Sequence, residues 1–306
     1  MFAYGHLGAV RSALDSYRFL ARQSASTRTD VEGMMPIQTI APIRVEEREG
    51  KIYQVSDGDD SLAIAERDFN DWRETISDHI QELLLGDFRP GTNHIRVRDR
   101  LEALGGILSS DIETIKERQF RLGYEIQRFK RLIALYDSKS DDIPALNDVV
   151  TKDLGLLKIH LLMGVGKLER WTEFRKAAKD DETHIGDANP SQVGDGLADA
   201  AEVLEQQPAY FDAKLPASFR WLAEAIQDPA GASKTMVFGA VRSAENLFSF
   251  LGRLALGIGT DVAGEVRTKI SKAVANSLFL GLTATALKIS GALPNGWQWL
   301  EPLLSV

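Results

Sequence analysis

Five basic side chains lie between residues 89 and 100 and form the densest positive cluster of the sequence. They are Arg89, His94, Arg96, Arg98 and Arg100. Guanidinium groups bind phosphate and carboxylate oxygens, and the free N–H groups at the start of a helix also favour anions. The cluster therefore predicts a site for a phosphate or an acidic partner. The favoured alternative is an exposed helix face whose arginines pair with nearby acids, because mixed charge is usual on such faces.

Other catalytic and metal-binding patterns are missing from the sequence. It contains no cysteine, which excludes disulfides, thiol catalysis, zinc fingers and iron–sulfur clusters. None of its five histidines has the His-Glu-x-x-His spacing of a zinc protease. Gly164-Val165-Gly166-Lys167 has one residue between its glycines where a phosphate loop has four, so these glycines predict close helix packing instead. We expect no metal and no cofactor, and an enzyme is the less favoured class.

Small side chains recur along the longest charge-free apolar stretch, residues 273–287. Ala273, Ser277, Gly281 and Thr285 stand at every fourth position, so they share one face of a predicted helix. Such a face lets another backbone approach closely, and in membranes it is a surface for helix association. We call these four residues the small-residue stripe and predict that it is a helix-packing or assembly surface.

The residues that flank this stretch resemble the two ends of a membrane-spanning helix, where lysine and tryptophan are common. They are Lys269, Lys272, Lys288, Trp297 and Trp299. A bilayer core requires about 20 helical residues, whereas the charge-free window is shorter and Lys288 interrupts its extension. A buried core helix is therefore the first interpretation, and a membrane-active hairpin is the second.

Apolar residues recur at helical spacing through most of the chain. The predicted helices cover residues 7–21, 62–85, 95–136, 144–178, 193–204, 219–226, 233–258 and 262–293. Gly105-Gly106 and the segment 109–111 are expected to kink or restart the third of these. Two β-type runs around Glu46–Gly50 predict a hairpin, the only strand-like part. The predicted fold is all-α, mainly a helical bundle, with one small β-hairpin near the N-terminus and a Gly/Ala-rich helical hairpin at the C-terminus.

Length and composition indicate a globular protein of roughly two domains. The chain has 306 residues, of which 44% are hydrophobic and 26% charged. We expect an N-terminal bundle with a long helical arm and the β-hairpin in residues 1–180, a linker with short helices in 181–232, and a hydrophobic helical hairpin in 233–306. The net charge of −8 argues against nucleic acid as a partner. The first residues lack signal-peptide features, which predicts a cytoplasmic protein, soluble or held at the cytoplasmic face of a membrane.

Three functional hypotheses follow from these patterns. The first is a non-enzymatic helical interaction or scaffold protein, which binds a protein partner or associates with itself. The second is a membrane-associated or pore-forming effector whose C-terminal hairpin inserts in or lies on a bilayer. The third and weakest is a nucleotide- or phosphate-binding protein that uses Arg89, Arg96, Arg98 and Arg100.

Overall fold

The structure is a computed structural model that describes residues 33–55, 62–137, 144–181, 184–228, 231–256 and 270–300. Over these residues the chain is all-α with one two-stranded antiparallel hairpin, as the sequence predicts. The predicted helix at residues 7–21 and the first residues of the last helix lie outside the described ranges. The elements are β1 (Val45–Arg48), β2 (Lys51–Gln54), α2 (Glu66–Leu85), α3 (Ile95–Leu108), α4 (Ile112–Glu117), α5 (Gln119–Asp137), α6 (Asp148–Val165), α7 (Glu169–Lys179), the 3-10 helix η1 (Ile185–Asp187), α8 (Pro190–Glu205), α9 (Lys214–Ile226), α10 (Lys234–Leu256) and α11 (Lys272–Gly291).

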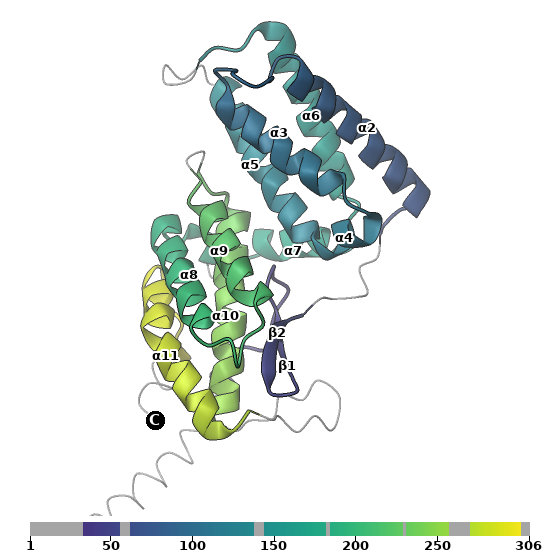
Figure 1. Ribbon diagram of the computed structural model, residues 1–306. Coiled ribbons are helices and arrows are strands. Elements are labelled where there is room, and N and C mark those ends of the chain that lie inside the picture. Colours follow the sequence, from purple (N-terminus) through teal and green to yellow (C-terminus); the bar gives the residue numbers. More distant parts are fainter. Residues whose placement is uncertain are drawn as a thin grey trace, which may run out of the picture.

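The helices form two groups that meet at α7 (Figure 1). The N-terminal helix group consists of α2 to α6, and the C-terminal helix group consists of α8 to α11 with the β-hairpin beside α10. The N-terminal group is an insertion between the hairpin and α7. Its first and last residues pair, because the Ala63 N–H donates to the Lys167 carbonyl at 2.9 Å beside an antiparallel bridge between Leu62 and Leu168.

Two of the long predicted helices are divided in the structure. The segment 95–136 restarts after Ser109, as predicted, and the Asp111 side chain caps α4 by accepting from the Thr114 N–H at 2.8 Å. The prediction of one continuous helix from residue 144 to residue 178 is wrong, because α6 ends at Val165 and α7 begins at Glu169. Buried Leu168 is the residue that precedes α7, and the helix axis changes direction there. This break turns α7 across the border between the two helix groups.

The β-hairpin packs on the C-terminal helix group, and not on the N-terminal bundle where we expected it. The Ile52 N–H donates to the Tyr210 carbonyl at 2.7 Å, and Asp212 donates back to the Ile52 carbonyl at 2.9 Å. Before the hairpin, the Ile43 N–H donates to the Ser243 hydroxyl on α10 at 3.1 Å. Buried Asn246 donates to the carbonyls of Thr39 and Ile43 at 3.0 Å. These side chains of α10 provide hydrogen-bond partners for the backbone before the hairpin, including both polar backbone groups of buried Ile43.

Three glycines let aromatic rings approach a helix backbone closely. A Cβ atom at Gly164 on α6 would overlap the Trp72 ring of α2, which confirms the predicted close packing there. A Cβ at Gly123 would overlap the Trp171 ring, and one at Gly239 would overlap the Tyr124 hydroxyl. Glycine is needed at these positions because any larger side chain must displace a ring in a closely packed interior.

Helices α10 and α11 run antiparallel and form the predicted C-terminal hairpin (Figure 1). Nearly every residue of α10 is buried. The inner face of α11 packs on α10 and α8 and buries Leu278, Phe279 and Leu282. Its far end is held by the Asn189 N–H, which donates to the Ala292 carbonyl at 3.2 Å.

Replacing Gly281 with alanine is expected to raise the free energy of unfolding by about 0.5–1 kcal/mol. A Cβ atom at this exposed helix position meets nothing within 4 Å, so alanine only reduces the freedom of the unfolded chain. Gly239→Ala is the matched control and should destabilise the protein, because its Cβ has no room. Urea denaturation of both variants measures the difference. A loss of stability in Gly281→Ala would mean that another chain covers this face.

Candidate functional site: an ionic cluster between two helix groups

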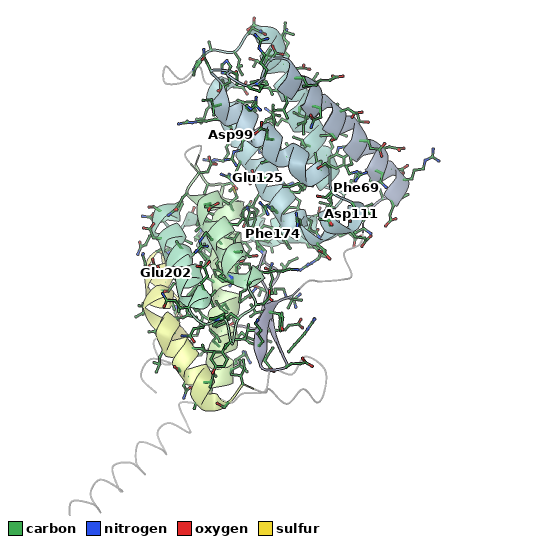
Figure 2. The ribbon with its side chains drawn as sticks, in the orientation of Figure 1. Phe69, Asp99, Asp111, Glu125, Phe174 and Glu202 are labelled. Atoms are coloured by element: carbon green, nitrogen blue, oxygen red, sulfur yellow. The ribbon has the colours of Figure 1, made fainter. Side chains whose placement is uncertain are left out.

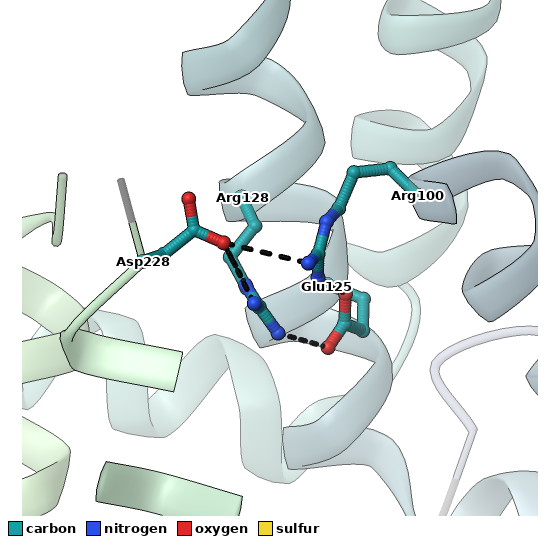
Figure 3. A network of polar contacts seen from close by, with 4 residues as sticks. All are labelled: Arg100, Glu125, Arg128 and Asp228. Carbon is teal, nitrogen blue, oxygen red and sulfur yellow. Dashed lines mark hydrogen bonds and ion pairs between the residues drawn. The ribbon is translucent and has the colours of Figure 1, made fainter. Parts of the chain in front are cut away.

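Two arginines and two carboxylates lie together where the helix groups meet (Figure 3). Arg100 comes from α3, Glu125 and Arg128 come from α5, and Asp228 follows the end of α9. Each Glu125 oxygen accepts from one arginine, since Oε2 is 2.8 Å from Nη1 of Arg100 and Oε1 is 2.8 Å from Nη1 of Arg128. We call these four residues the ionic cluster.

Asp228 connects the C-terminal helix group to both arginines of the ionic cluster. Its Oδ2 atom accepts from Nε of Arg128 at 2.7 Å and from Nη2 at 2.6 Å. The same oxygen lies 3.6 Å from Nη2 of Arg100. Two N–H groups of one guanidinium thus converge on a single carboxylate oxygen, and such charge-assisted hydrogen bonds are stronger than neutral ones. Asp228 therefore fixes the end of α9 against α5.

The ionic cluster is mostly buried and its charges balance. The side chains of Glu125 and Asp228 are 6% and 7% exposed, while those of Arg100 and Arg128 are 22% and 11% exposed. Arginine keeps its charge at every accessible pH. Each of these ions has therefore left water for a partner of opposite sign, and the loss of one partner would leave a buried charge without compensation.

Aromatic side chains from both groups pack next to the ionic cluster. Tyr124 precedes Glu125 on α5, and its ring lies 5.2 Å from Trp221 of α9 and 6.1 Å from Trp171 of α7 between centroids. The Tyr124 hydroxyl donates to the Met236 carbonyl of α10 at 3.0 Å. Phe174 adds contacts to Phe238 of α10, and Figure 2 shows Phe174 and Glu125 near the border of the two groups. We call these rings, with Phe120, the aromatic junction.

Complete burial raises the pKa of the Tyr124 phenol well above its ordinary value of 10.0. The folded protein keeps this phenol neutral at a pH where the unfolded chain ionises it. Stability is therefore present below pH 10 and is lost as the pH rises above that value. Tyr124→Phe should cost about 1 kcal/mol at neutral pH, for the lost hydrogen bond, and should lose less stability at alkaline pH. Thermal denaturation across this pH range measures it, and parallel alkaline losses in both proteins would contradict it.

The structure separates the basic residues that the sequence clusters. Arg89 and Arg96 are exposed. Arg98 donates to Glu102 at 2.5 Å and to the Phe88 carbonyl at 3.2 Å. The His94 ring lies beside Tyr136, with Nδ1 3.3 Å from the hydroxyl. Arg100 points instead into the ionic cluster. Glu125, Arg128 and Asp228 were not predicted, and their sequence positions give no signal, because Asp228 lies 100 residues from Arg128.

Three members of the small-residue stripe face outward. Ala273, Ser277 and Gly281 are exposed, while Thr285 is 4% exposed and packs inside. A Cβ atom added at Gly281 would meet no atom of the described residues within 4 Å. Leu280 and Leu287 lie on the same outer side and are 67% and 46% exposed. The outer face of α11 is thus uncharged over several turns.

The predicted membrane flanks lie in different surroundings. Trp297 and Trp299 are each 5% exposed and stack on one another with centroids 5.8 Å apart. Lys288 pairs with Asp199 of α8 at 2.7 Å. Lys269 and the side chain of Lys272 lie outside the described part of the chain. Among the described residues, α11 is the one helix long and apolar enough to cross a membrane, with a mean hydropathy of 1.3 over residues 273–291, and 39% of this window is buried.

A row of large apolar side chains is exposed on α6. Its members are Val149, Leu156, Ile159 and Met163, which are 75%, 53%, 50% and 62% exposed. The helical spacing of the sequence places Val149 on the same apolar face as Leu154, Leu157 and Leu161. Only the other side of α6, with Leu154, Leu157 and Leu161, is buried. We call the four exposed residues the α6 face.

No protein-family model, no curated protein and no solved structure matches this chain. In the described part of the chain, no group of three or more His, Asp or Glu side chains is placed to hold a metal ion. Function is therefore inferred from the two features that the geometry brings out, the ionic cluster and the exposed apolar helix faces.

Proposed function

We propose that the protein is a non-enzymatic helical interaction protein that binds an amphipathic helix of a partner chain along the α6 face. The spacing of the α6 face carries this proposal. Val149, Leu156 and Met163 follow one another at seven-residue intervals, and Ile159 stands between the last two. This is the spacing with which one helix contacts another along a coiled-coil seam or in a groove.

The length of the α6 face also favours a binding surface. Helix α6 has 18 residues and is therefore about 27 Å long. Scattered exposed apolar residues are normal on a protein surface, but four of them on one side of a helix, with Lys152 between the first and the second, favour a binding surface. The four side chains run along most of this length. Their burial by a partner helix would supply the binding energy.

The polar residues beside the α6 face favour a different chain over a second copy as the partner. Lys152 and His160 are exposed on the same side of α6. Antiparallel pairing of two copies about Leu156 places Lys152 of one copy opposite His160 of the other, which offers the lysine no negative charge. A helix with a carboxylate beside its apolar row complements the lysine better.

Two designed helical peptides of about three heptads test this proposal. They share an identical leucine row, and the positions beside it carry glutamate in one peptide and lysine in the other. We expect the glutamate peptide to bind at least about tenfold more tightly in fluorescence anisotropy. Binding of the lysine peptide with equal affinity would contradict the proposed charge preference.

Leu156→Glu should weaken binding of the glutamate peptide by about 30-fold or more, because it places a carboxylate at the centre of the apolar row. Leu85→Glu is the control, since Leu85 at the end of α2 is 79% exposed and lies outside the α6 face. Binding that survives Leu156→Glu would exclude the α6 face. Dimers that form at high concentration and disappear in Leu156→Glu would identify the partner as a second copy.

A membrane-associated effector is the second candidate, supported by the uncharged outer face of α11 with its exposed Leu280 and Leu287. A location at the cytoplasmic face of a membrane belongs to this proposal. The full chain should then float with vesicles of phosphatidylcholine and phosphatidylglycerol, and Leu280→Glu should prevent flotation. Failure of the full chain to float would exclude this candidate.

A further inference from the structure

The N-terminal helix group is attached to the rest of the molecule at one end. The chain enters this group at Leu62 and leaves it at Leu168. These two crossings lie side by side, because the Ala63 N–H donates to the Lys167 carbonyl and Leu62 forms a bridge with Leu168. An insertion whose two crossings lie side by side can rotate about that connection without breaking its own helices. Its orientation must therefore be set by contacts elsewhere on the border.

Three kinds of contact are available there, one of which is the single hydrogen bond from the Tyr124 hydroxyl to the Met236 carbonyl of α10. The aromatic junction supplies ring packing, whose attraction depends on area more than on direction. The ionic cluster supplies several charge-assisted N–H···O bonds, which depend on direction more strongly than ring packing does, and two of them join Nε and Nη2 of Arg128 to one oxygen of Asp228. Glu125 joins Arg100 of α3 to Arg128 of α5 inside the N-terminal group, while Asp228 joins both arginines to the C-terminal group.

We propose that the ionic cluster is a clamp that sets the orientation of the N-terminal helix group relative to the C-terminal group. Asp228 is its movable part. When Asp228 releases the two arginines, the groups rotate about the paired crossings and the aromatic junction while each keeps its helices. The clamp thereby fixes the α6 face relative to α11, because these helices belong to different groups (Figure 1).

The absence of cysteine allows a direct measurement of this orientation. Asp99 on α3 and Glu202 on α8 are exposed and lie in different groups (Figure 2). Spin labels on Asp99→Cys and Glu202→Cys report the distance between the groups by electron paramagnetic resonance. We expect one narrow distribution in the parent chain. Asp228→Asn should broaden it about twofold and shift its centre, while circular dichroism shows unchanged helix content.

Glu125→Gln is the matched control, because it removes one carboxylate from the same cluster and leaves the Asp228–Arg128 contact in place. It should lower the thermal midpoint while keeping the narrow distribution. A distribution that stays narrow in Asp228→Asn would overturn the clamp and leave the cluster with a stabilising role only. Equal broadening in both variants would also overturn it, since the orientation would then not depend on Asp228 in particular. A loss of helix in Asp228→Asn would overturn the separate folding of the two groups.

Discussion

Replacing Trp171 with alanine is expected to lower the free energy of unfolding by about 3–5 kcal/mol, the usual range for removing a buried tryptophan. Trp171 is fully buried and lies 5.5 Å from Phe174 and 6.1 Å from Tyr124 between ring centroids. Its ring also fills the space above Gly123, so its removal leaves a cavity that the backbone of α5 cannot close. Urea denaturation followed by circular dichroism measures the change.

The contribution of Trp171 comes from packing alone. Its indole N–H makes no hydrogen bond within the described residues, so the alanine variant loses none. Trp171→Phe, which keeps an aromatic ring, should therefore recover a large part of the stability. Leu85→Ala is the surface control and should stay within about 0.5 kcal/mol of the parent. A similar small effect for Trp171→Ala would show that the aromatic junction does not hold the two groups together.

The position of Trp171 in the core could be predicted from the sequence, whereas its role could not. Leu168, Trp171 and Phe174 recur at helical spacing, and this periodicity places them on one buried face. Spacing along one helix does not say which other helix it meets. The break after Gly166 turns α7 by a local backbone change, and the apolar pattern continues through it, so the sequence predicts a single helix.

The outer faces of α6 and α11 show a second limit of sequence periodicity. Both helices are apolar on several sides, so hydrophobic periodicity alone does not distinguish the side that packs from the side that is exposed. The helical spacing groups Val149 with Leu154 and Leu157, yet Val149 is 75% exposed while the other two are buried. The stripe of Ala273, Ser277 and Gly281 suggested a close approach to α11, and Gly281 has nothing near it, whereas Gly196 of α8 lies so close to α11 that a Cβ atom there would overlap Ile289.

The ionic cluster lay beyond sequence reasoning because its members are brought together by tertiary structure. Arg100 was noticed for its basic neighbours, but its partner Glu125 lies 25 residues further on. Charged residues are common in this sequence, and 26% of it consists of them. Charge alone therefore does not mark the few that become buried, and only the packing of α3, α5 and α9 selects them.

Replacing Glu125 with glutamine is expected to cost about 3 kcal/mol or more of unfolding free energy. Glutamine keeps the shape of the side chain and removes the negative charge that Arg100 and Arg128 share. Because Glu125 is only 6% exposed, water cannot replace that charge. Glu205→Gln removes a carboxylate from an ion pair with Arg220 whose side chains are 43% and 51% exposed, and it should change the urea midpoint little.

A double substitution separates the charge effect from the loss of contacts. Arg100→Gln combined with Glu125→Gln removes one charge of each sign, so the remaining pair, Arg128 and Asp228, stays balanced. We expect the double variant to be more stable than the sum of the two single losses by at least about 1 kcal/mol. If the losses simply add, the two residues act independently. Burial of an unpaired charge would then not be what makes Glu125 necessary, and the loss would come from its hydrogen bonds alone.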